Sequence, residues 1–293
     1  MKVIVTGGAG FVGTNLIKKL LEDGHSVTSL DNYSTGKKEN EQEGCTYHDV
    51  DLSKVSYISH FMDKPDIIYH LCALARIQPS LKKPVKTIKN NFISTLHILD
   101  YARENDIPVV YAGSSTFHHG LWGSPYAWSK HSGEQLCELY TKVFGLRTSI
   151  CRFYNVYGEH QLEDGAYSTV LGIFQKQYRE GKPLTITGDG EQRRDFTHID
   201  DIIDALSKMG NGLLSDGVLT INGETFELGR GKNFSINELA SMFGEEYPTE
   251  YIPARDGEYD YTLADSSKAK KLLGWNPTLD ISDYISDVID DKS

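Results

Sequence analysis

The sequence has few cysteines and no long apolar run, and these two shortages exclude several classes of protein. Its four cysteines, Cys45, Cys72, Cys137 and Cys151, lie far apart and include no Cys-x-x-Cys pair. We therefore expect reduced thiols and no disulfide framework. No apolar stretch approaches the ~18 residues that suggest a membrane span. Because a predicted strand begins directly after Met1, there is no room for a signal peptide, and we expect the cytoplasm as the compartment.

Positive charge is also scarce in this chain. It has 30 Lys and Arg against 41 Asp and Glu, a formal net charge of −11 and an isoelectric point near 5.4. An acidic surface opposes the phosphate attraction on which nucleic-acid binding depends, so we expect no DNA or RNA partner. An anionic substrate would need a local cluster of arginines to receive it. The length of 293 residues suits one large α/β unit or two closely joined lobes.

Strand-like and helix-like segments alternate along the first half of the chain. Long helical stretches are expected at Phe11–Asp23, Asn91–Glu104 and Tyr126–Phe144. The apolar, β-rich runs between them lie at Lys2–Thr6, Ser26–Leu30, Cys45–His48, Asp66–Leu71, Pro108–Ala112, Arg147–Phe153 and Val218–Asn222. Several runs are almost continuously hydrophobic, as is typical of parallel strands covered on both faces. The alternation predicts a doubly wound parallel sheet, the Rossmann architecture.

After Asn155 this rhythm changes. Segments rich in turn-forming residues lie at Gly158–Gly165 and Gly181–Arg194, and shorter helices are expected at Phe234–Phe243 and Asp265–Leu273. We therefore expect residues 1–155 to form the sheet domain, with a return segment near 195–225. Residues 156–293 are expected to form mainly a smaller α/β lobe.

A glycine-rich turn joins the first predicted strand to the first predicted helix. Gly7, Gly10 and Gly13 allow a tight turn, close approach of the backbone to a pyrophosphate, and close packing of helix on strand. The start of the helix offers free N–H groups to the anion. Asp31 ends the second predicted strand, where a carboxylate can accept hydrogen bonds from both ribose hydroxyls. Because that carboxylate would repel a ribose phosphate, we expect NAD rather than NADP.

Tyr126 and Lys130 form the candidate catalytic pair. They are four residues apart on a predicted helix, so their side chains share one face. A tyrosine with its reference pKa of about 10 is a poor base at neutral pH, and a neighbouring ammonium and a positive nicotinamide ring would lower that pKa. Ser115 follows the strand Pro108–Ala112 and is positioned to hydrogen-bond the reacting oxygen.

Together these segments resemble the extended short-chain dehydrogenase/reductase family, and within it the NAD-dependent nucleotide-sugar epimerases and dehydratases. The resemblance extends over essentially the whole chain. Its matching segments are Thr6–Gly13, Asp31–Gly36, His48–Asp51, His70–Ala75, Asn90–Asn91, Ser124–Lys130, Arg152–Gly158, Gly188–Asp201 and Arg255–Glu258.

The resemblance implies a role for each matching position. Residues 1–155 would bind NAD, which would stay bound and be regenerated in each turnover, and residues 156–293 would bind the nucleotide sugar. The implied cofactor residues are Gly7, Gly10, Phe11, Val12, Gly13, Asp31, Asn32, Ser34, Thr35, Gly36, Asp49, Val50, Leu71, Ala73, Ala75, Asn90, Ser114, Tyr126, Lys130 and Tyr154. The implied substrate residues are Ser115, Thr116, Tyr126, Asn155, Thr185, Thr187, Arg194 and Arg255. Of these, Asn155 and the two arginines would hold the diphosphate, and the two threonines at 185 and 187 would contact the base.

The residues after Ser115 favour one reaction within this family. The family's dehydratases place an Asp-Glu pair there and its decarboxylases a Glu, whereas this chain has Thr116 and Phe117. Ser115, Tyr126 and Lys130 with NAD resemble a UDP-glucose 4-epimerase, which inverts C4 of a UDP-sugar through a transient 4-keto intermediate with Tyr126 as base and then acid. Another NAD-dependent sugar oxidoreductase, a dehydratase and a non-catalytic NAD-bound regulatory protein are the alternatives. Neither the sugar nor the base is determined by the sequence.

Two departures from the family pattern lie just before Tyr126. Relatives usually read Val-Tyr-Gly where this chain has His118-His119-Gly120, and only five residues then precede Tyr126. This loop is much shorter than is usual in the family, so we expect a more open sugar pocket. We interpret the two histidines as partly exposed loop residues, and we predict no metal site. In this family two helices, here Asn91–Glu104 and Tyr126–Phe144, usually pair with their copies in a second subunit, so the resemblance implies a homodimer.

Overall fold

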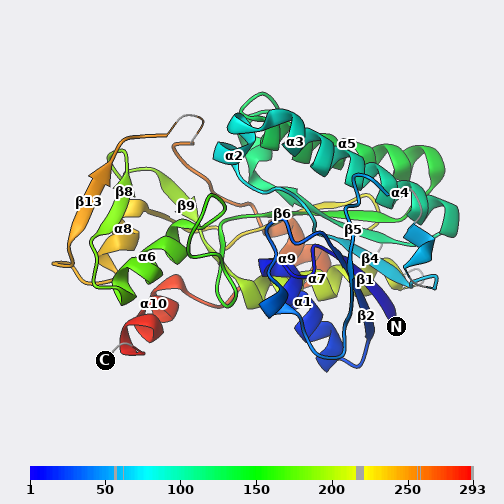
Figure 1. Ribbon diagram of the computed structural model, residues 1–293, viewed down its shortest axis with the longest axis horizontal. Helices are drawn as coiled ribbons and strands as arrows, with labels where there is room; N and C mark the ends of the chain where they lie inside the picture. Colours follow the sequence, from blue (N-terminus) through cyan, green and yellow to red (C-terminus); the bar gives the residue numbers. More distant parts are fainter. Residues whose placement is uncertain (56–57, 62, 216–220, 256, 258, 292–293) are drawn as a thin grey trace.

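The computed structural model describes residues 1–55, 58–61, 63–215, 221–255, 257 and 259–291. These residues form a large lobe around a parallel sheet and a smaller lobe beside it (Figure 1). The sheet has seven strands in the order β11-β6-β5-β4-β1-β2-β3, and neighbouring strands are parallel throughout. The strands are β1 Lys2–Thr6, β2 Ser26–Asp31, β3 Thr46–Asp49, β4 Ile67–His70, β5 Val109–Ser114, β6 Thr148–Phe153 and β11 Thr225–Leu228.

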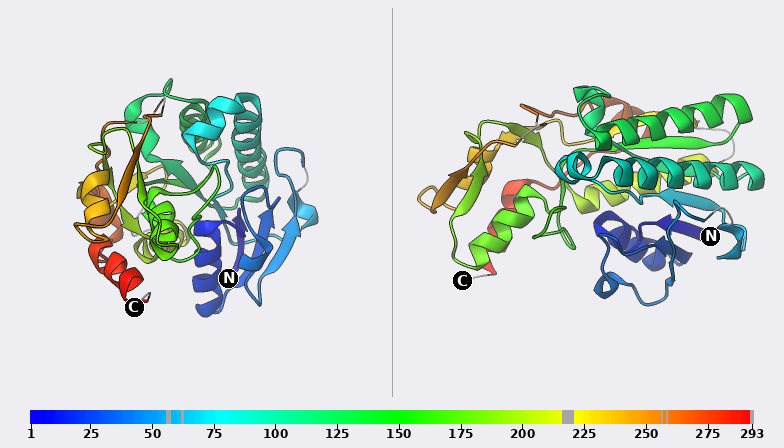
Figure 2. Two further views of the ribbon diagram at one scale, coloured as in Figure 1. Left: turned by 60° about the vertical axis from the view of Figure 1, so that its left-hand side comes forward. Right: turned by 45° about the horizontal axis from the view of Figure 1, so that its top comes forward.

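Helices cover both faces of this sheet, as the sequence predicts for a Rossmann fold. On one face lie α1 (Phe11–Glu22), α7 (Ile199–Leu214) and α9 (Ser267–Leu273), which pack with the side chains of Val3 and Val5. The other face carries α2 (Ile77–Lys82), α3 (Pro84–Ile88), α4 (Ser94–Asn105) and α5 (Pro125–Phe144). Ile4 packs on this second face, because successive residues of a strand point to opposite sides. Figure 2 shows α4 and α5 lying side by side.

The smaller lobe has its own apolar core. Two short ladders support it: β8 (Leu184–Thr187) runs parallel to β13 (Thr249–Ile252), and β9 (Arg193–Asp195) runs antiparallel to β12 (Asn233–Ser235). The helices α6 (Val170–Arg179), α8 (Ile236–Ser241) and α10 (Ile281–Asp290) surround a core that includes Phe174, Ile186 and Ile285. A further pair, β7 (Val156–Tyr157) with β10 (Thr197–His198), lies between the lobes in the chain. Among the described residues, no helix combines the length and apolarity needed to cross a bilayer.

The predicted sheet is confirmed, with one misplaced strand. We expected a strand at Val218–Asn222. Residues 216–220 lie outside the described part of the chain, Ile221 and Asn222 belong to a loop, and the edge strand β11 starts at Thr225. Ile221 is buried in the core beside α7, and the amide oxygen of Asn222 accepts the backbone N–H of Thr148 at 3.0 Å. Burial in this core explains the apolar residue at position 221.

The helices differ more from the prediction. The helix expected from Asn91 begins at Ser94, because residues 89–93 form a π-helical turn before it. Three helices of the structure, α6, α7 and α10, were not predicted from the sequence. In α7 the signal was present, since Ile199, Ile202, Ile203 and Leu206 recur at helical spacing and are all buried.

Asp195 forms hydrogen bonds with segments that are far apart in the sequence. Its side chain is fully buried at the end of β9. The carboxylate accepts backbone N–H bonds from Arg230 at 2.9 Å, Gly231 at 2.9 Å and Ala264 at 3.0 Å. Its own carbonyl oxygen accepts the side-chain amide of Asn155 at 2.9 Å. One residue therefore satisfies backbone groups of two loops that are far apart in sequence.

Replacing Asp195 with Ala should destabilise the protein strongly. Three buried N–H groups would lose their acceptor, at roughly 1–3 kcal/mol each, so we expect a loss on the order of 3 kcal/mol or more in the free energy of unfolding. Asp195→Asn keeps one acceptor oxygen and should lose less. Asp287→Ala, at an exposed position of α10, is the matched control. Urea denaturation measures all three, and an Asp195→Ala loss no larger than that of the control would contradict the assigned role.

Candidate active site

A cavity of about 850 Å³ lies at the carboxyl edge of the sheet, between the two lobes. The loops after β1, β2, β4 and β5 form one side, and residues of the 162–173 and 185–196 segments form the other. Strand order reverses at this place, because β1 continues to β2 on one side and pairs with β4 on the other. Ligands of doubly wound sheets bind in such a crevice.

The glycine turn that follows β1 lines this cavity with Gly7, Gly10 and Gly13. Gly7 has a φ of +74°, which favours glycine, and a Cβ added at Gly13 would lie 2.2 Å from the carbonyl oxygen of Gly7. No side chain caps the start of α1 at Gly10, so the first N–H groups of the helix are open to a ligand anion. The turn therefore fits a dinucleotide pyrophosphate, as the sequence predicts.

Asp31 lies at the end of β2, on the wall next to this turn. Its carboxylate accepts the backbone N–H of Ala9 at 3.0 Å and that of Tyr33 at 2.8 Å. Burial raises the pKa of this carboxyl, and the two N–H bonds oppose the increase. A carboxylate has about four lone-pair positions, so Asp31 keeps acceptor capacity for the hydroxyls of a ribose.

Tyr126 lies in the first turn of α5, which begins with Ser124 as its N-cap and Pro125. The Ser124 hydroxyl accepts the backbone N–H of Ala127 at 3.0 Å, which fixes the start of the helix and so the position of the phenol. The Tyr126 hydroxyl donates to the Ser114 hydroxyl oxygen at 3.4 Å. Ser115 lines the same cavity, but the hydrogen bond of Tyr126 goes to Ser114, at the last residue of β5.

The charges around Tyr126 include one cation that the sequence did not predict. Burial raises the pKa of Tyr126, whereas the Ser114 hydroxyl and the Arg76 guanidinium act to lower it. Lys130 is buried, which lowers its pKa to about 8, and its ammonium lies 4.5 Å from the ring centre of Tyr111. The Tyr111 ring holds this ammonium by a cation–π contact. Arg76 is therefore a cation that acts to lower the pKa of the phenol, and the sequence did not predict it.

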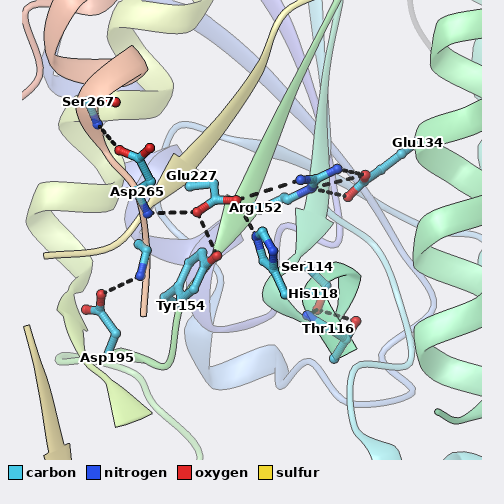
Figure 3. A network of polar contacts seen from close by, with 11 residues as sticks. Ser114, Thr116, His118, Glu134, Arg152, Tyr154, Asp195, Glu227, Asp265 and Ser267 are labelled. Carbon is cyan, nitrogen blue, oxygen red and sulfur yellow. Dashed lines mark hydrogen bonds and ion pairs between the residues drawn. The ribbon is translucent and has the colours of Figure 1, made fainter. Parts of the chain in front are cut away.

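A network of buried charges fixes the loop after β5 (Figure 3). Arg152 pairs with Glu134 at 2.7 Å and approaches Glu227 at 3.8 Å, and its guanidinium lies 3.3 Å from the ring centre of Phe117. Glu227 also bonds His118. Glu134 and Glu227 thus face a shared cation, and neither carboxylate lines the large cavity, within the described part of the chain.

The network explains two residues that the sequence left uncertain. His118 is partly exposed, as we expected, and its Nε2 is also bonded to Glu227. Tyr154, which we expected near the cofactor, is buried and donates to Glu227 at 2.9 Å. His118 and Tyr154 line a second, adjoining cavity of about 440 Å³, which Ser115 also lines. The described side chains therefore leave space next to Ser115, on the side of the short loop.

The predicted site residues come together at the large cavity with three exceptions. Gly36, Asp49 and Tyr154 are absent from its described lining. A Cβ at Gly36 would lie 2.9 Å from the backbone of Ala9, so Gly36 packs against the glycine turn. Asp49 pairs with Asp31 in the β3–β2 ladder, so it lies next to a residue that lines the cavity. The wall also contains residues that the sequence prediction did not include, among them Arg76, Lys82, Tyr167, Gln192 and Tyr259. Lys82 ends the short helix α2, and the other four lie outside helices and strands, where no periodic signal marks them.

The smaller lobe contributes the residues that we expected to hold a substrate. Arg194, Thr185 and Thr187 line the cavity from β9 and β8, and Arg255 lines it from the segment after β13. Asn155 also lines it, and its amide donates to Asp195 at 2.9 Å. Two arginines facing one cavity supply the local cation cluster that an anionic ligand of an acidic protein requires.

Comparisons with known proteins agree with this geometry. Residues 3–213 match the family model described as the NAD dependent epimerase/dehydratase family. A putative UDP-glucose 4-epimerase from Methanocaldococcus jannaschii is 31% identical over 98% of this chain and 97% of its own length. UDP-glucuronic acid decarboxylase 1 from Danio rerio is 28% identical over 98% of this chain and 72% of its own length.

A solved structure extends the similarity to the whole fold. It is a mutant of the UDP-glucuronic acid 4-epimerase from Bacillus cereus, in complex with UDP-4-deoxy-4-fluoro-glucuronic acid and NAD. It is 30% identical, has a TM-score of 0.87, and covers 100% of this chain and of its own. The family resemblance seen in the sequence is therefore confirmed, and NAD is the cofactor.

Replacing Asp31 with Ala should weaken NAD binding. Hydrogen bonds to a charged acceptor contribute roughly 1.5–3 kcal/mol each, so losing them should raise the dissociation constant of NAD by about 100-fold. Asp23→Ala, at the exposed end of α1 where Asp23 pairs with Lys19, should leave it unchanged. Titration calorimetry with NAD and NADP measures both. An Asp31→Ala protein that binds NAD like the control would show that this carboxylate does not hold the ribose.

Proposed function

The chain belongs to the NAD dependent epimerase/dehydratase family, and within it we propose that the protein is an isomerase that inverts C4 of a UDP-sugar. The observation that carries this proposal is the composition of the loop after β5. Ser114, Ser115 and Thr116 bring hydroxyls to the cavity, and neither they nor Phe117 after them carries a carboxyl group or a thiol. Tyr126 is therefore the group that transfers the proton at the sugar.

The residues of this chain suit a reversible proton transfer at a sugar hydroxyl. When bound, NAD⁺ supplies the acceptor for the hydrogen that leaves C4. Tyr126 as phenolate takes the proton of the 4-hydroxyl and later returns it to the same oxygen. Ser115 donates a hydrogen bond to that oxygen, Ser114 orients the phenol, and Lys130 contacts the nicotinamide ribose. The sugar carries a ketone at C4 between the two transfers and turns about its diphosphate to present its other face.

The competing hypothesis is that the protein is a dehydratase or a decarboxylase, because a UDP-glucuronic acid decarboxylase is among the relatives. Elimination needs a further acid and base near the sugar. Two carboxylates beside this loop, those of Glu134 and Glu227, pair with Arg152 instead. The composition of the wall therefore supports epimerisation over elimination.

The diphosphate clamp and the dimer are further parts of this proposal. Arg194 and Arg255, with Asn155, hold the diphosphate, and Thr185 and Thr187 contact the uracil. Two copies pair through α4 and α5 as a homodimer. In support of the dimer, Leu139, Val143 and Phe144 of α5 are large apolar side chains with exposed fractions of 49%, 61% and 53%, and burial of such a patch is favourable. A sedimentation experiment that finds only a monomer would contradict the dimer.

The purified protein should convert a UDP-sugar into its C4 epimer with no added reductant. Incubation with a panel of UDP- and GDP-sugars, followed by NMR of the products, identifies both the reaction and the base. We expect Tyr126→Phe to lower turnover by a factor of roughly 10²–10⁴, the usual contribution of a general acid–base group, while NAD still binds. Net consumption of NADH would instead identify a sugar reductase, and binding without any turnover a regulatory protein.

Ser114 and Ser115 should respond differently to removal of the hydroxyl. Ser115→Ala loses a hydrogen bond to the reacting oxygen and should lower kcat by a factor of about 10²–10³, the size of losing one donor to a developing charge. Ser114→Ala removes only the neighbour of the Tyr126 phenol and should raise the apparent pKa of the acidic limb of the pH–rate profile. Steady-state kinetics over a pH range separates the two effects. A larger loss of kcat in Ser114→Ala than in Ser115→Ala would reverse the assignment.

A further inference from the structure

Among the described residues that line the large cavity, cationic side chains outnumber carboxylates. Among its described lining residues the only carboxylate is that of Asp31, whereas five cations share the wall: Arg76, Lys82, Lys130, Arg194 and Arg255. The proposed function uses Lys130 at the nicotinamide ribose and the arginines at 194 and 255 at the diphosphate of the substrate. Arg76 and Lys82 then remain without an assigned anion.

Arg76 lies in the loop between β4 and α2, at the N-cap of that short helix. Its side chain is half-buried and its Nε donates to the carbonyl oxygen of Tyr167 at 3.1 Å. Among the described residues, no carboxylate pairs with it. A guanidinium has five N–H donors, so the terminal nitrogens have donors left over for the cavity that Arg76 lines.

Arg76 shares the cavity wall with Tyr126, the proposed reacting group. Tyr126 and Arg76 line the same cavity, and each side chain feels the charge of the other. The Arg76 side chain is only partly exposed, and this burial lowers its pKa. Other ionisable groups that act on Tyr126 are Glu134 from α5, Tyr111 from β5 and Tyr259 from the segment after β13. A partly desolvated cation gains most from an anion that arrives with the ligand.

We infer that Arg76 binds a carboxylate carried by the sugar, so that the substrate is a nucleotide-linked uronic acid. The inference rests on the proposed C4 chemistry, because it places the 4-hydroxyl at Tyr126. A carboxylate on C5 is attached to the carbon next to C4 and so lies at the same end of the cavity. The planar fork of a guanidinium matches both carboxylate oxygens in a bidentate pair. A neutral hexose would leave Arg76 without an anion.

The test compares UDP-glucuronate with UDP-glucose in binding and in turnover. Binding is measured by calorimetry with NAD present in the Tyr126→Phe background, because Arg76 also acts on Tyr126 and a turnover measurement alone would mix the two effects. We expect UDP-glucuronate to bind about 100-fold more tightly than UDP-glucose, as for a bidentate charged pair. Arg76→Gln in that background should abolish this preference and change UDP-glucose binding by less than about threefold.

Two controls make the outcome specific. Arg76→Lys keeps the charge without the fork and should retain an intermediate preference. Arg103→Leu removes an arginine on the surface of α4, where it pairs with Asp100, and should retain the full preference. Equal binding of the two sugars, or an equal loss of both in Arg76→Gln, would overturn the inference.

The outcome for Arg76 can be separated from that for the proposed function. If UDP-glucose is epimerised and the uronate is not preferred, the inference about Arg76 is wrong and C4 epimerisation stands. If the uronate is preferred through Arg76 but neither sugar yields a C4 epimer, the proposed reaction is wrong and the carboxylate site stands. If neither UDP-sugar binds, both are wrong.

Discussion

Parallel strands that end at one edge, with their order reversed between β1 and β4, determine where the proposed cofactor site and its neighbours in the large lobe lie. Loops that leave neighbouring strands on opposite faces cannot fill the space between them, and the cavity occupies that space. The glycine turn follows β1, Asp31 ends β2, Arg76 follows β4 and Ser114 ends β5. Residues widely separated in sequence therefore meet because each stands at the same end of its strand.

The net charge of −11 does not describe the large cavity, where cationic side chains gather. The described lining of the large cavity is cationic, whereas the buried acids behind it, Glu134 and Glu227, share Arg152. Gly113 makes this pairing feasible, because a Cβ there would lie 2.5 Å from a Glu134 carboxylate oxygen. The proposed chemistry depends on this separation, since it brings anions to the cavity and leaves Tyr126 as the proton-transferring group.

The sequence allowed the fold and much of the cavity to be predicted, because both depend on local patterns. Continuous apolar runs located the strands, and the spacing of Tyr126 and Lys130 placed both on α5. It did not reveal which groups touch across loops. Arg76 is fifty positions before Tyr126, so neither strand nor helical periodicity relates the two. The roles of Tyr154 and His118 likewise depend on Glu227, which lies on a strand that was expected several residues earlier.

The central claim is that hydrogen leaves C4 and returns to it within one bound complex. A UDP-sugar substrate of the protein, labelled with deuterium at C4 and incubated in ordinary water, tests it most directly by NMR of the products. The account predicts a C4 epimer that keeps the label at C4, with no exchange of hydrogen at C3 or C5. Loss of the C4 label to the solvent, or incorporation of solvent hydrogen at C5, would contradict it.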